Sequence, residues 1–355
     1  MAPKRVVAGI DLGSTSLRVR LWCPDDDKIH PVQSRDFRQY NSRYTLGDFS
    51  TTCHPFDTCG EVYLGEDIDP TRDAVSLKYE QGLKQLFSRV FDRIRVWKVE
   101  TTEIYRDIVQ SVLPDNSIEM FFVTETEALA HFLCRNYRDL ILKQPSPVGN
   151  DTILFLDFGG HSMNSCIYHV SNTGGNDDTR SFFLIGDAVG AGGGSEQWEH
   201  YVAQEAIKYI EVYKGRRGAM SPKHKHDLRD QFDRDKGRYA LEENKEFQFE
   251  AVRGLDGKEL EISLGHTIIN SCFERAMENP LQKAREQFER LVSAADGEDA
   301  WVAVAGGTAQ HPGIRERIGQ LCQEHGTHPP VFIDLLEIDE QATVRSKSRK
   351  GLPTQ

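Results

Sequence analysis

Two segments of the chain share one pattern, and this repeat constrains the fold more than any other feature. Residues 6–22 and 152–168 each consist of an apolar run, a turn containing an aspartate and a glycine, and then alternating residues. Such a pattern is typical of a buried strand that turns tightly into a second strand. The two turns begin at Asp11 and Asp157, 146 residues apart. A chain that carries the same hairpin twice at this distance is predicted to fold as two related lobes.

The segment between the hairpins marks a boundary. Residues 143–150 contain two prolines, a glycine and an asparagine, which is typical of a connection between packed units. We therefore expect lobe I at residues 1–145 and lobe II at residues 146–337. A C-terminal helix over about residues 338–355 is expected to return to lobe I.

Apolar residues at intervals of three and four predict helices around the hairpins. The spacing recurs over residues 77–94, after Glu125, and over residues 268–292. In the last segment we expect a break at Pro280, because proline lacks an N–H group and its ring clashes with the preceding turn. The apolar stripe expected after Glu125 consists of Ala128, Leu129, Phe132, Leu133, Leu140 and Ile141.

The charge balance restricts the partners of the chain. Among 355 residues, 43 Lys and Arg stand against 55 Asp and Glu, which gives a net charge of −12. Proteins that coat nucleic acid or anionic lipid need a cationic surface, so we expect neither a nucleic acid nor a membrane as partner. No stretch approaches the roughly 18 apolar residues of a membrane span, and seven scattered cysteines fit a reducing compartment. The sequence therefore predicts a cytoplasmic protein.

Glycine-rich turns carry the chemistry that the sequence predicts. In residues 11–15, a glycine lets a phosphate approach the backbone, N–H groups bind its oxygens, and hydroxyl groups add donors. Residues 157–162 repeat the carboxylate, glycines and hydroxyl, and further turns lie at 190–195 and 305–308. The last follows a predicted strand and precedes a helix opened by Pro312. Each turn by itself can be explained without a ligand, as an ordinary polar hairpin or as a strand–helix connection. Two copies that both contain a carboxylate predict a site that binds a polyphosphate from two sides.

Five motifs stand in the order and spacing of a known superfamily. They are Gly-Ile-Asp-Leu-Gly-Ser-Thr at 9–15, Thr-Glu-Thr-Glu-Ala-Leu-Ala at 124–130, Leu-Asp-Phe-Gly-Gly-His-Ser at 156–162, Gly-Gly-Ser at 193–195 and Ala-Gly-Gly-Thr at 305–308. Over essentially its whole length the chain resembles the actin-like ATPases. Within them it resembles the nucleotide-binding domain of the 70-kDa heat-shock chaperones, of the divergent type common in filamentous fungi. The resemblance implies an α/β fold of two duplicated ribonuclease-H-like lobes with a nucleotide cleft between them.

The resemblance also implies a role for each matching residue. ATP or ADP and Mg²⁺ would be the ligands, and Asp11 and Asp157 would order waters around the metal. Lys78 would stabilise the transferring phosphoryl group, although a helix-surface lysine is the alternative for this position. Glu125 would place the metal waters and the attacking water, and Ser162 would contact the γ-phosphate. The residues implied to bind the nucleotide are Gly13, Ser14, Thr15, Gly159, Gly160, Gly193, Gly194, Ser195, Asp233, Lys236, Gly306, Gly307 and Thr308.

Three residues depart from the family pattern. His161 replaces the third glycine of the phosphate turn. If φ is positive there, a side chain costs about 1 kcal/mol or more and crowds the γ-phosphate; an imidazole also offers acid–base chemistry, so His161 is a candidate catalytic residue. Gly237 and Gln310 stand where arginines would contact adenine, in or near a helical part of lobe II expected over about residues 203–300. Their loss is expected to weaken base binding by about 1 kcal/mol.

The sequence leaves three functions open. The first is slow ATP hydrolysis by a stand-alone heat-shock-70-like domain that has no peptide-binding domain and signals through a partner protein. The second is phosphoryl transfer to a small molecule, or another biosynthetic step, on the same fold. The third is a pseudo-ATPase scaffold, which the retained polar residues of the phosphate shell argue against. We therefore expect an ATPase or an ATP-dependent phosphotransferase.

Overall fold

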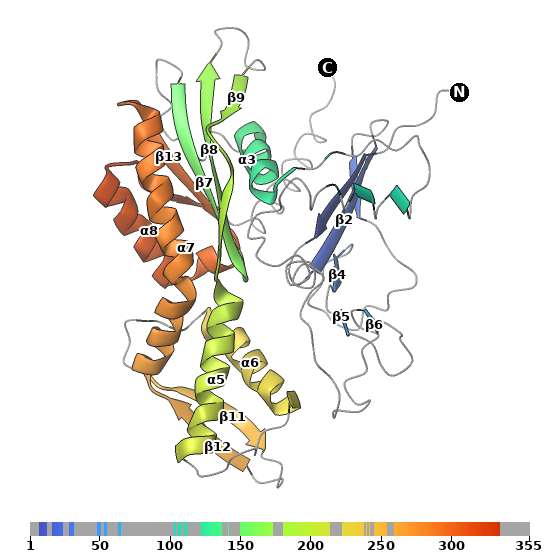
Figure 1. The fold of residues 1–355 in the computed structure, drawn as a ribbon, viewed down its shortest axis with the longest axis vertical. Helices are drawn as coiled ribbons and strands as arrows, with labels where there is room; N and C mark the ends of the chain where they lie inside the picture. Colours follow the sequence, from blue (N-terminus) through green and yellow to red (C-terminus); the bar gives the residue numbers. More distant parts are fainter. Residues whose placement is uncertain are drawn as a thin grey trace, which may run out of the picture. The chain divides into compact units, whose positions relative to one another are not determined.

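The computed structural model describes most of the second half of the chain and separate strands of the first (Figure 1). The described residues are 7–12, 16–23, 28–31, 48–50, 53–54, 63–64, 103, 106–107, 110–111, 121, 123–136, 141, 150–172, 180–213, 222–237, 239, 241, 245–253 and 259–333. The chain forms two compact units, Met1–Ile118 and Glu119–Gln355. The helices expected over residues 77–94 and 338–355 lie outside the described residues, and the lobe limits at residues 145 and 146 stay a prediction.

Short antiparallel strands form the described part of the first unit. They are β1 (Val7–Leu12), β2 (Ser16–Cys23), β3 (Lys28–Pro31), β4 (Asp48–Ser50), β5 (Cys53–His54) and β6 (Tyr63–Leu64). β1 and β2 pair from Val7 with Trp22 to Leu12 with Leu17. The first predicted hairpin is therefore confirmed as two adjacent antiparallel strands. β3 and β4 pair with β2, and β5 pairs with β6.

A six-stranded mixed sheet is the centre of the second unit. Its strands are β7 (Asn150–Phe158), β8 (Ser162–Asn172), β9 (Arg180–Leu184), β10 (Val189–Gly192), β13 (Ala300–Ala305) and β14 (Val331–Phe332). The order is β10-β8-β7-β13-β14, and β9 also pairs with β8. β7 and β8 form the second predicted hairpin, which is thereby confirmed. β13 runs parallel to both β7 and β14.

Helices cover both faces of this sheet because its central strands are apolar on both sides. Leu154 and Leu156 of β7 belong to one buried cluster with residues of α7 (His266–Ala295) and α8 (Pro312–His325). Ile153 and Phe155 belong to a second buried cluster with residues of α3 (Glu125–Asn136). Figure 1 shows α3 on one side of the sheet and α7 and α8 on the other. Each fully buried large side chain contributes about 1.5–3 kcal/mol to folding.

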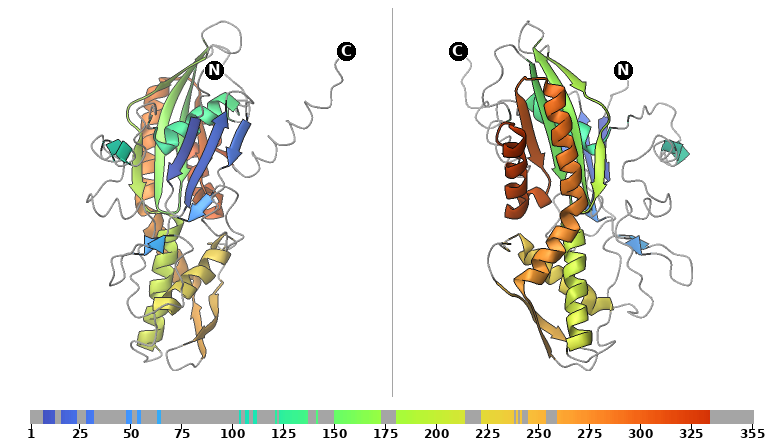
Figure 2. Two further views of the ribbon diagram at one scale, coloured as in Figure 1. Left: turned by 90° about the vertical axis from the view of Figure 1, so that its right-hand side faces the viewer. Right: turned by 60° about the vertical axis from the view of Figure 1, so that its left-hand side comes forward.

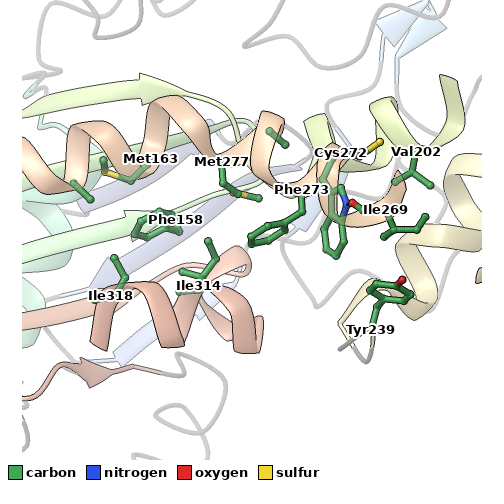
Figure 3. Packing of buried hydrophobic residues seen from close by; sticks show 14 of the residues in the cluster. Phe158, Met163, Val202, Tyr239, Ile269, Cys272, Phe273, Met277, Ile314 and Ile318 are labelled. Carbon is green, nitrogen blue, oxygen red and sulfur yellow. The ribbon is translucent and has the colours of Figure 1, made fainter. Parts of the chain in front are cut away.

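A second layer of structure packs around one buried tryptophan. α5 (Ser195–Tyr213), α6 (Pro222–Lys236) and the hairpin β11 (Phe247–Arg253) and β12 (Glu259–Leu264) make up this layer. The ring of Trp198 lies edge-on to the rings of Phe232, Phe273 and His311, and its Nε1 donates to the carbonyl of Ile269 at 3.1 Å. Figure 3 shows the cluster continuing from Phe158 in the sheet to Tyr239. The start of α5 is therefore fixed to the sheet by a continuous core.

The longest helix differs from the prediction. α7 runs without interruption from His266 to Ala295 and contains Pro280, so the expected break is wrong (Figure 2). Its buried residues, which include Phe273, Phe288 and Leu291, pack from both sides of the proline, and this burial outweighs the roughly 3 kcal/mol that an interior proline costs. None of the helices in the described part of the chain combines the length and apolarity needed to cross a membrane.

α3 begins where the sequence predicts it, and its buried face matches the predicted stripe in part. Leu133 is buried as predicted, as is Ile141 beyond the helix, and Leu129 packs against the same cluster. Ala128 and Phe132 are exposed, whereas Thr126, Ala130 and Cys134 are buried. A buried threonine and cysteine shift the buried stripe by part of a turn from the stripe expected from large apolar residues alone.

Candidate functional site

Three glycine turns meet at one edge of the central sheet of the second unit. The first turn, residues 159–161, joins β7 to β8, and the second, residues 193–194, joins β10 to α5. The third, residues 306–307, follows β13 and leads into the short 3-10 helix η2 (Thr308–Gln310). β7 and β13 are parallel neighbours with Asp157 opposite Ala305, so their carboxyl ends reach the same edge. Turns that lie far apart in the sequence are thus brought together.

One threonine hydroxyl group links all three turns. The Oγ1 atom of Thr308 donates a hydrogen bond to the carbonyl of Gly159 at 2.8 Å and accepts one from the N–H group of Ser195 at 3.3 Å. Backbone bonds add to this link, since Gly193 donates to the carbonyl of His161 at 2.9 Å and Glu196 to that of Gly160 at 3.0 Å. The three turns are therefore joined to one another by hydrogen bonds.

Two glycines allow the turns to approach so closely. Gly194 has φ +153°, and a Cβ atom there would lie 2.4 Å from the carbonyl oxygens of both Gly159 and Gly160. Gly306 has φ +98°, and a Cβ atom there would lie 2.3 Å from the carbonyl oxygen of Phe158 and 2.6 Å from Oδ1 of Asp157. No larger residue fits either position without moving backbone.

The turns present features that favour an anion. α5 begins at Ser195, and the N-terminus of a helix carries partial positive charge and N–H groups that lack helical acceptors. The backbone N–H groups of Gly160 and Gly307 belong to the first and third of these turns. Asp157, the last residue but one of β7, stands beside them. This arrangement suits a phosphate group together with a cation near Asp157.

His161 occupies the first turn without the strain that a positive φ would cause. Asp296 is the one described residue other than glycine with positive φ, so the cost anticipated for His161 does not arise. Its Nδ1 atom lies 2.7 Å from Oε1 of Glu196 in the first turn of α5. The Glu196 side chain also covers Gly160, because a Cβ atom on that glycine would lie 2.5 Å from Oε1. Glu196 was missed by the sequence reasoning, and its place two residues after a glycine pair was the signal available.

Burial, together with the neighbouring carboxylate of Glu199, raises the pKa of Glu196 to about 7, although Arg229 and Lys236 act to lower it. Glu199 is itself buried and forms ion pairs with Lys236 and, at 3.4 Å, with Arg229. A carboxyl group with a pKa near neutrality, next to an imidazole, exchanges protons in the physiological range.

The residues expected to contact adenosine lie in the same charged cluster. Lys236, at the end of α6, contacts the carboxylates of Glu199 and, at 2.7 Å, Asp233. Burial acts to lower the pKa of Lys236, but these two carboxylates raise it above its ordinary value. Lys236 therefore stays charged and joins α6 to α5.

Gln310 has a charged neighbour that the sequence reasoning missed. Its Oε1 atom accepts a hydrogen bond from Nη2 of Arg315 at 2.7 Å, and the Arg315 guanidinium lies 4.7 Å from the centre of the Phe332 ring. An arginine thus lies beside Gln310 in the fold.

Two capping arrangements hold the helices near the site. His311 caps α8, since its Nδ1 accepts from the N–H group of Gly313 at 3.1 Å while its Nε2 lies 3.0 Å from the carbonyl oxygen of Tyr239. At α3, the Thr124 hydroxyl accepts from the N–H group of Glu127, whose carboxylate accepts from Thr124 N–H at 3.0 Å. This reciprocal pair fixes the first turn of α3, which contains the exposed Glu125.

The remaining candidate residues are placed in part. Ser162 begins β8, and its carbonyl accepts from Gly159 N–H at 2.9 Å. Asp11 lies in β1, with its side chain outside the described set. Gly13, Ser14, Thr15 and Lys78 lie outside the described residues. Among the described residues no group of three His, Cys, Asp or Glu side chains could hold a metal ion; Mg²⁺ needs no such group, because it keeps waters and binds one or two carboxylates together with phosphate oxygens.

Comparisons with known proteins bear on the fold. No family model matches the chain, and no curated protein matches it in sequence. Among solved structures, the chain is similar to MreB5 of Spiroplasma citri bound to AMPPNP, with a TM-score of 0.52 and 14% identity over 99% of this chain and 100% of that one. At this level of identity the likeness concerns the fold alone, and the mixed α/β architecture described here is similar to that of MreB5.

Proposed function

We propose that this chain binds ATP with Mg²⁺ and hydrolyses it slowly, as a heat-shock-70-like nucleotide-binding domain. The observation that carries the proposal is the meeting of three glycine turns, joined by Thr308, at the N-terminus of α5. The turns suit phosphate groups because a side chain is excluded at Gly194 and Gly306 and because N–H groups lie at their tips. The fold shared with an AMPPNP-bound protein is in keeping with this ligand.

The proposal assigns the residues as follows. Gly160, Gly307 and the start of α5 bind phosphate oxygens, and Gly13, Ser14 and Thr15 supply a further phosphate turn. Asp157 and Asp11 hold waters of the Mg²⁺ ion, which neutralises charge on the phosphates when bound. Lys78, Glu125 and Ser162 serve the reacting phosphoryl group. Asp233 and Lys236 contact the nucleoside, with low affinity because Gly237 and Gln310 offer no guanidinium for stacking.

Titration calorimetry on the folded full chain tests the binding. We expect heat on adding ATP with Mg²⁺, and a weaker signal when a chelator removes the metal. No heat under either condition, from protein with an intact circular dichroism spectrum, would contradict the proposal and favour an interaction scaffold.

A matched pair of substitutions tests the metal assignment. Asp157→Asn is nearly isosteric and should remove Mg²⁺-dependent turnover while the fold persists. Asp187→Asn removes an exposed carboxylate before β10 and should leave turnover unchanged. Equal turnover in the two variants would exclude Asp157 as a metal-water residue.

The His161–Glu196 pair favours phosphoryl transfer to a small molecule as a second candidate, because an imidazole beside a carboxylate suits proton removal from an acceptor hydroxyl. The fate of labelled γ-phosphate separates the two functions. Release as inorganic phosphate supports hydrolysis, and incorporation into an added hydroxyl or carboxylate compound supports transfer.

A further inference from the structure

We infer that Glu196 is a positioning residue that holds His161 as the general base for the nucleophile attacking the γ-phosphate. The inference rests on the proposed function and adds a pair of residues to it, in which His161 takes the proton and Glu196 positions His161. Glu196 lies on α5 and His161 in the β7–β8 turn, so the pair spans two of the three glycine turns.

The pair is held by backbone as well as side-chain contacts. The Nδ1 atom of His161 lies 2.7 Å from Oε1 of Glu196, and the Glu196 N–H donates to the Gly160 carbonyl at 3.0 Å. The His161 carbonyl in turn accepts from Gly193 at 2.9 Å. Three contacts across two turns leave the imidazole and the carboxylate little freedom to separate.

The charged side chains around Glu196 influence its carboxylate from nearby, and the carboxylate keeps its charge for the contact with His161. Glu199 lies one turn along α5, and α6 contributes Arg229, Asp233 and Lys236. Lys236 and Arg229 contact Glu199 rather than Glu196, so they partly offset the charge of the two carboxylates. His161 from the turn is the partner that contacts Glu196.

This arrangement selects one form of the imidazole. A carboxylate next to Nδ1 favours the tautomer whose proton is on Nδ1, which leaves Nε2 as the acceptor. In the reaction, the oxygen of water forms a bond to the γ-phosphorus while its proton moves to Nε2. The bond from the γ-phosphorus to the bridging oxygen breaks, and its electron pair leaves with ADP. The imidazolium then returns its proton to solvent.

The pair also sets a pH dependence. Burial raises the pKa of Glu196 to about 7, so the carboxylate gains a proton as the pH falls through this value and no longer holds the Nδ1 proton. The hydrolysis rate should therefore fall on the acidic side of neutrality. Replacement of Glu196 by glutamine should lower the hydrolysis rate above neutral pH. It should also remove the part of the pH dependence that comes from the Glu196 carboxyl group.

Histidine NMR on the nucleotide-free full chain tests the pair independently of turnover. With ¹⁵N-labelled histidine above neutral pH, we expect His161 as the Nδ1-protonated tautomer in the wild type and as a mixture in Glu196→Ala, which removes the acceptor. A matched control is Glu205→Ala on the same helix, where Glu205 pairs with Lys208, and this variant should leave the His161 signals unchanged. Identical tautomers in the wild type and Glu196→Ala would overturn the inference.

Kinetic measurements test the role of His161 as the general base. We expect His161→Asn to lower kcat about 100-fold, the low end of the usual contribution of a general base, with little change in the ATP Kd. His200→Asn, on α5 next to Gln204, should change neither value. If His161→Asn fails to fold, His161→Gly replaces it as the test. An unchanged kcat in a folded His161 variant that binds ATP would overturn the inference, whereas absence of ATP binding by the wild type would contradict the proposed function itself.

Discussion

The Thr308 hydroxyl group is the smallest unit on which the site depends. Thr308 is almost fully buried, and its hydroxyl satisfies a carbonyl of one glycine turn and an N–H group of another. A methyl group in its place would leave both backbone groups without this partner. A hydroxyl thus has a structural role here that is separate from any contact with phosphate.

Replacement of Thr308 by valine should therefore destabilise the protein by about 1–3 kcal/mol, the usual cost of unsatisfied buried polar groups. Thr308→Ser keeps the hydroxyl and should cost less. Urea unfolding of the two variants measures the difference. Equal free energies of unfolding would show that the hydroxyl does not hold the turns.

Two glycine-to-alanine substitutions should have opposite signs. Gly306→Ala places a Cβ atom 2.3 Å from a backbone carbonyl oxygen at φ +98°, so we expect a loss of at least about 2 kcal/mol. A Cβ atom added to Gly319, inside α8, would meet no other atom within 4 Å, and alanine should stabilise the helix there by about 0.5–1 kcal/mol. Thermal unfolding followed by circular dichroism compares them, and a shift in the same direction for both would contradict the geometry.

The glycine turns could be predicted from the sequence because each of them consists of consecutive residues. The partner of His161 could not, because Glu196 reaches it only after β8, β9 and β10 bring the chain back. The same reason applies to Lys236, whose contact with Glu199 crosses 37 positions.

At the scale of elements, α8 depends on a histidine where helices more often have serine, threonine or aspartate. His311 accepts from Gly313 through Nδ1 and faces the Tyr239 carbonyl through Nε2, which requires a neutral ring. Burial lowers the pKa of His311 below 6.5, although bonds to the backbone of Tyr239 and Lys236 act to raise it.

A pH dependence of stability follows. Below about pH 6.5 the unfolded chain takes up the His311 proton while the folded protein does not, so the free energy of unfolding decreases as the pH falls. His311→Asn keeps a capping acceptor and should flatten this part of the profile, whereas His328→Asn, at a half-exposed position paired with Asp299, serves as the control. Urea unfolding between about pH 5 and 8 measures the profiles, and parallel curves for wild type and His311→Asn would contradict the role.

The elements themselves show where sequence patterns succeed. Both hairpins, the strand before Gly306 and the helix opened by Pro312 are confirmed, because each has a strong local signal. The continuation of α7 through Pro280 was not predicted, because it depends on burial along both halves of the helix. Local rules break down where long-range packing supplies more free energy than the local preference removes.

For the whole molecule, ligand binding and folding are linked. A ligand that binds the folded chain alone raises the free energy of unfolding by about 2.7 kcal/mol at 100 times its Kd. We therefore expect ATP with Mg²⁺ to raise the thermal midpoint measured by scanning fluorimetry, and Gly306→Ala to reduce this increase. If ATP raised the thermal midpoint of Gly306→Ala as much as that of the wild type, the ligand would have to bind away from the glycine turns.

The parallel pairing of β13 with β7 has a consequence for the order of assembly. β7 and β8 are joined by a tight turn and can pair as soon as both have left the ribosome, whereas β13 must find β7 across about 140 intervening residues. Synthesis must therefore pass Thr308 before the turns can close. A nascent chain that stops before β13 has the first glycine turn without the Thr308 hydroxyl group that links it to the other turns, so the proposed phosphate site cannot form until most of the second unit has emerged.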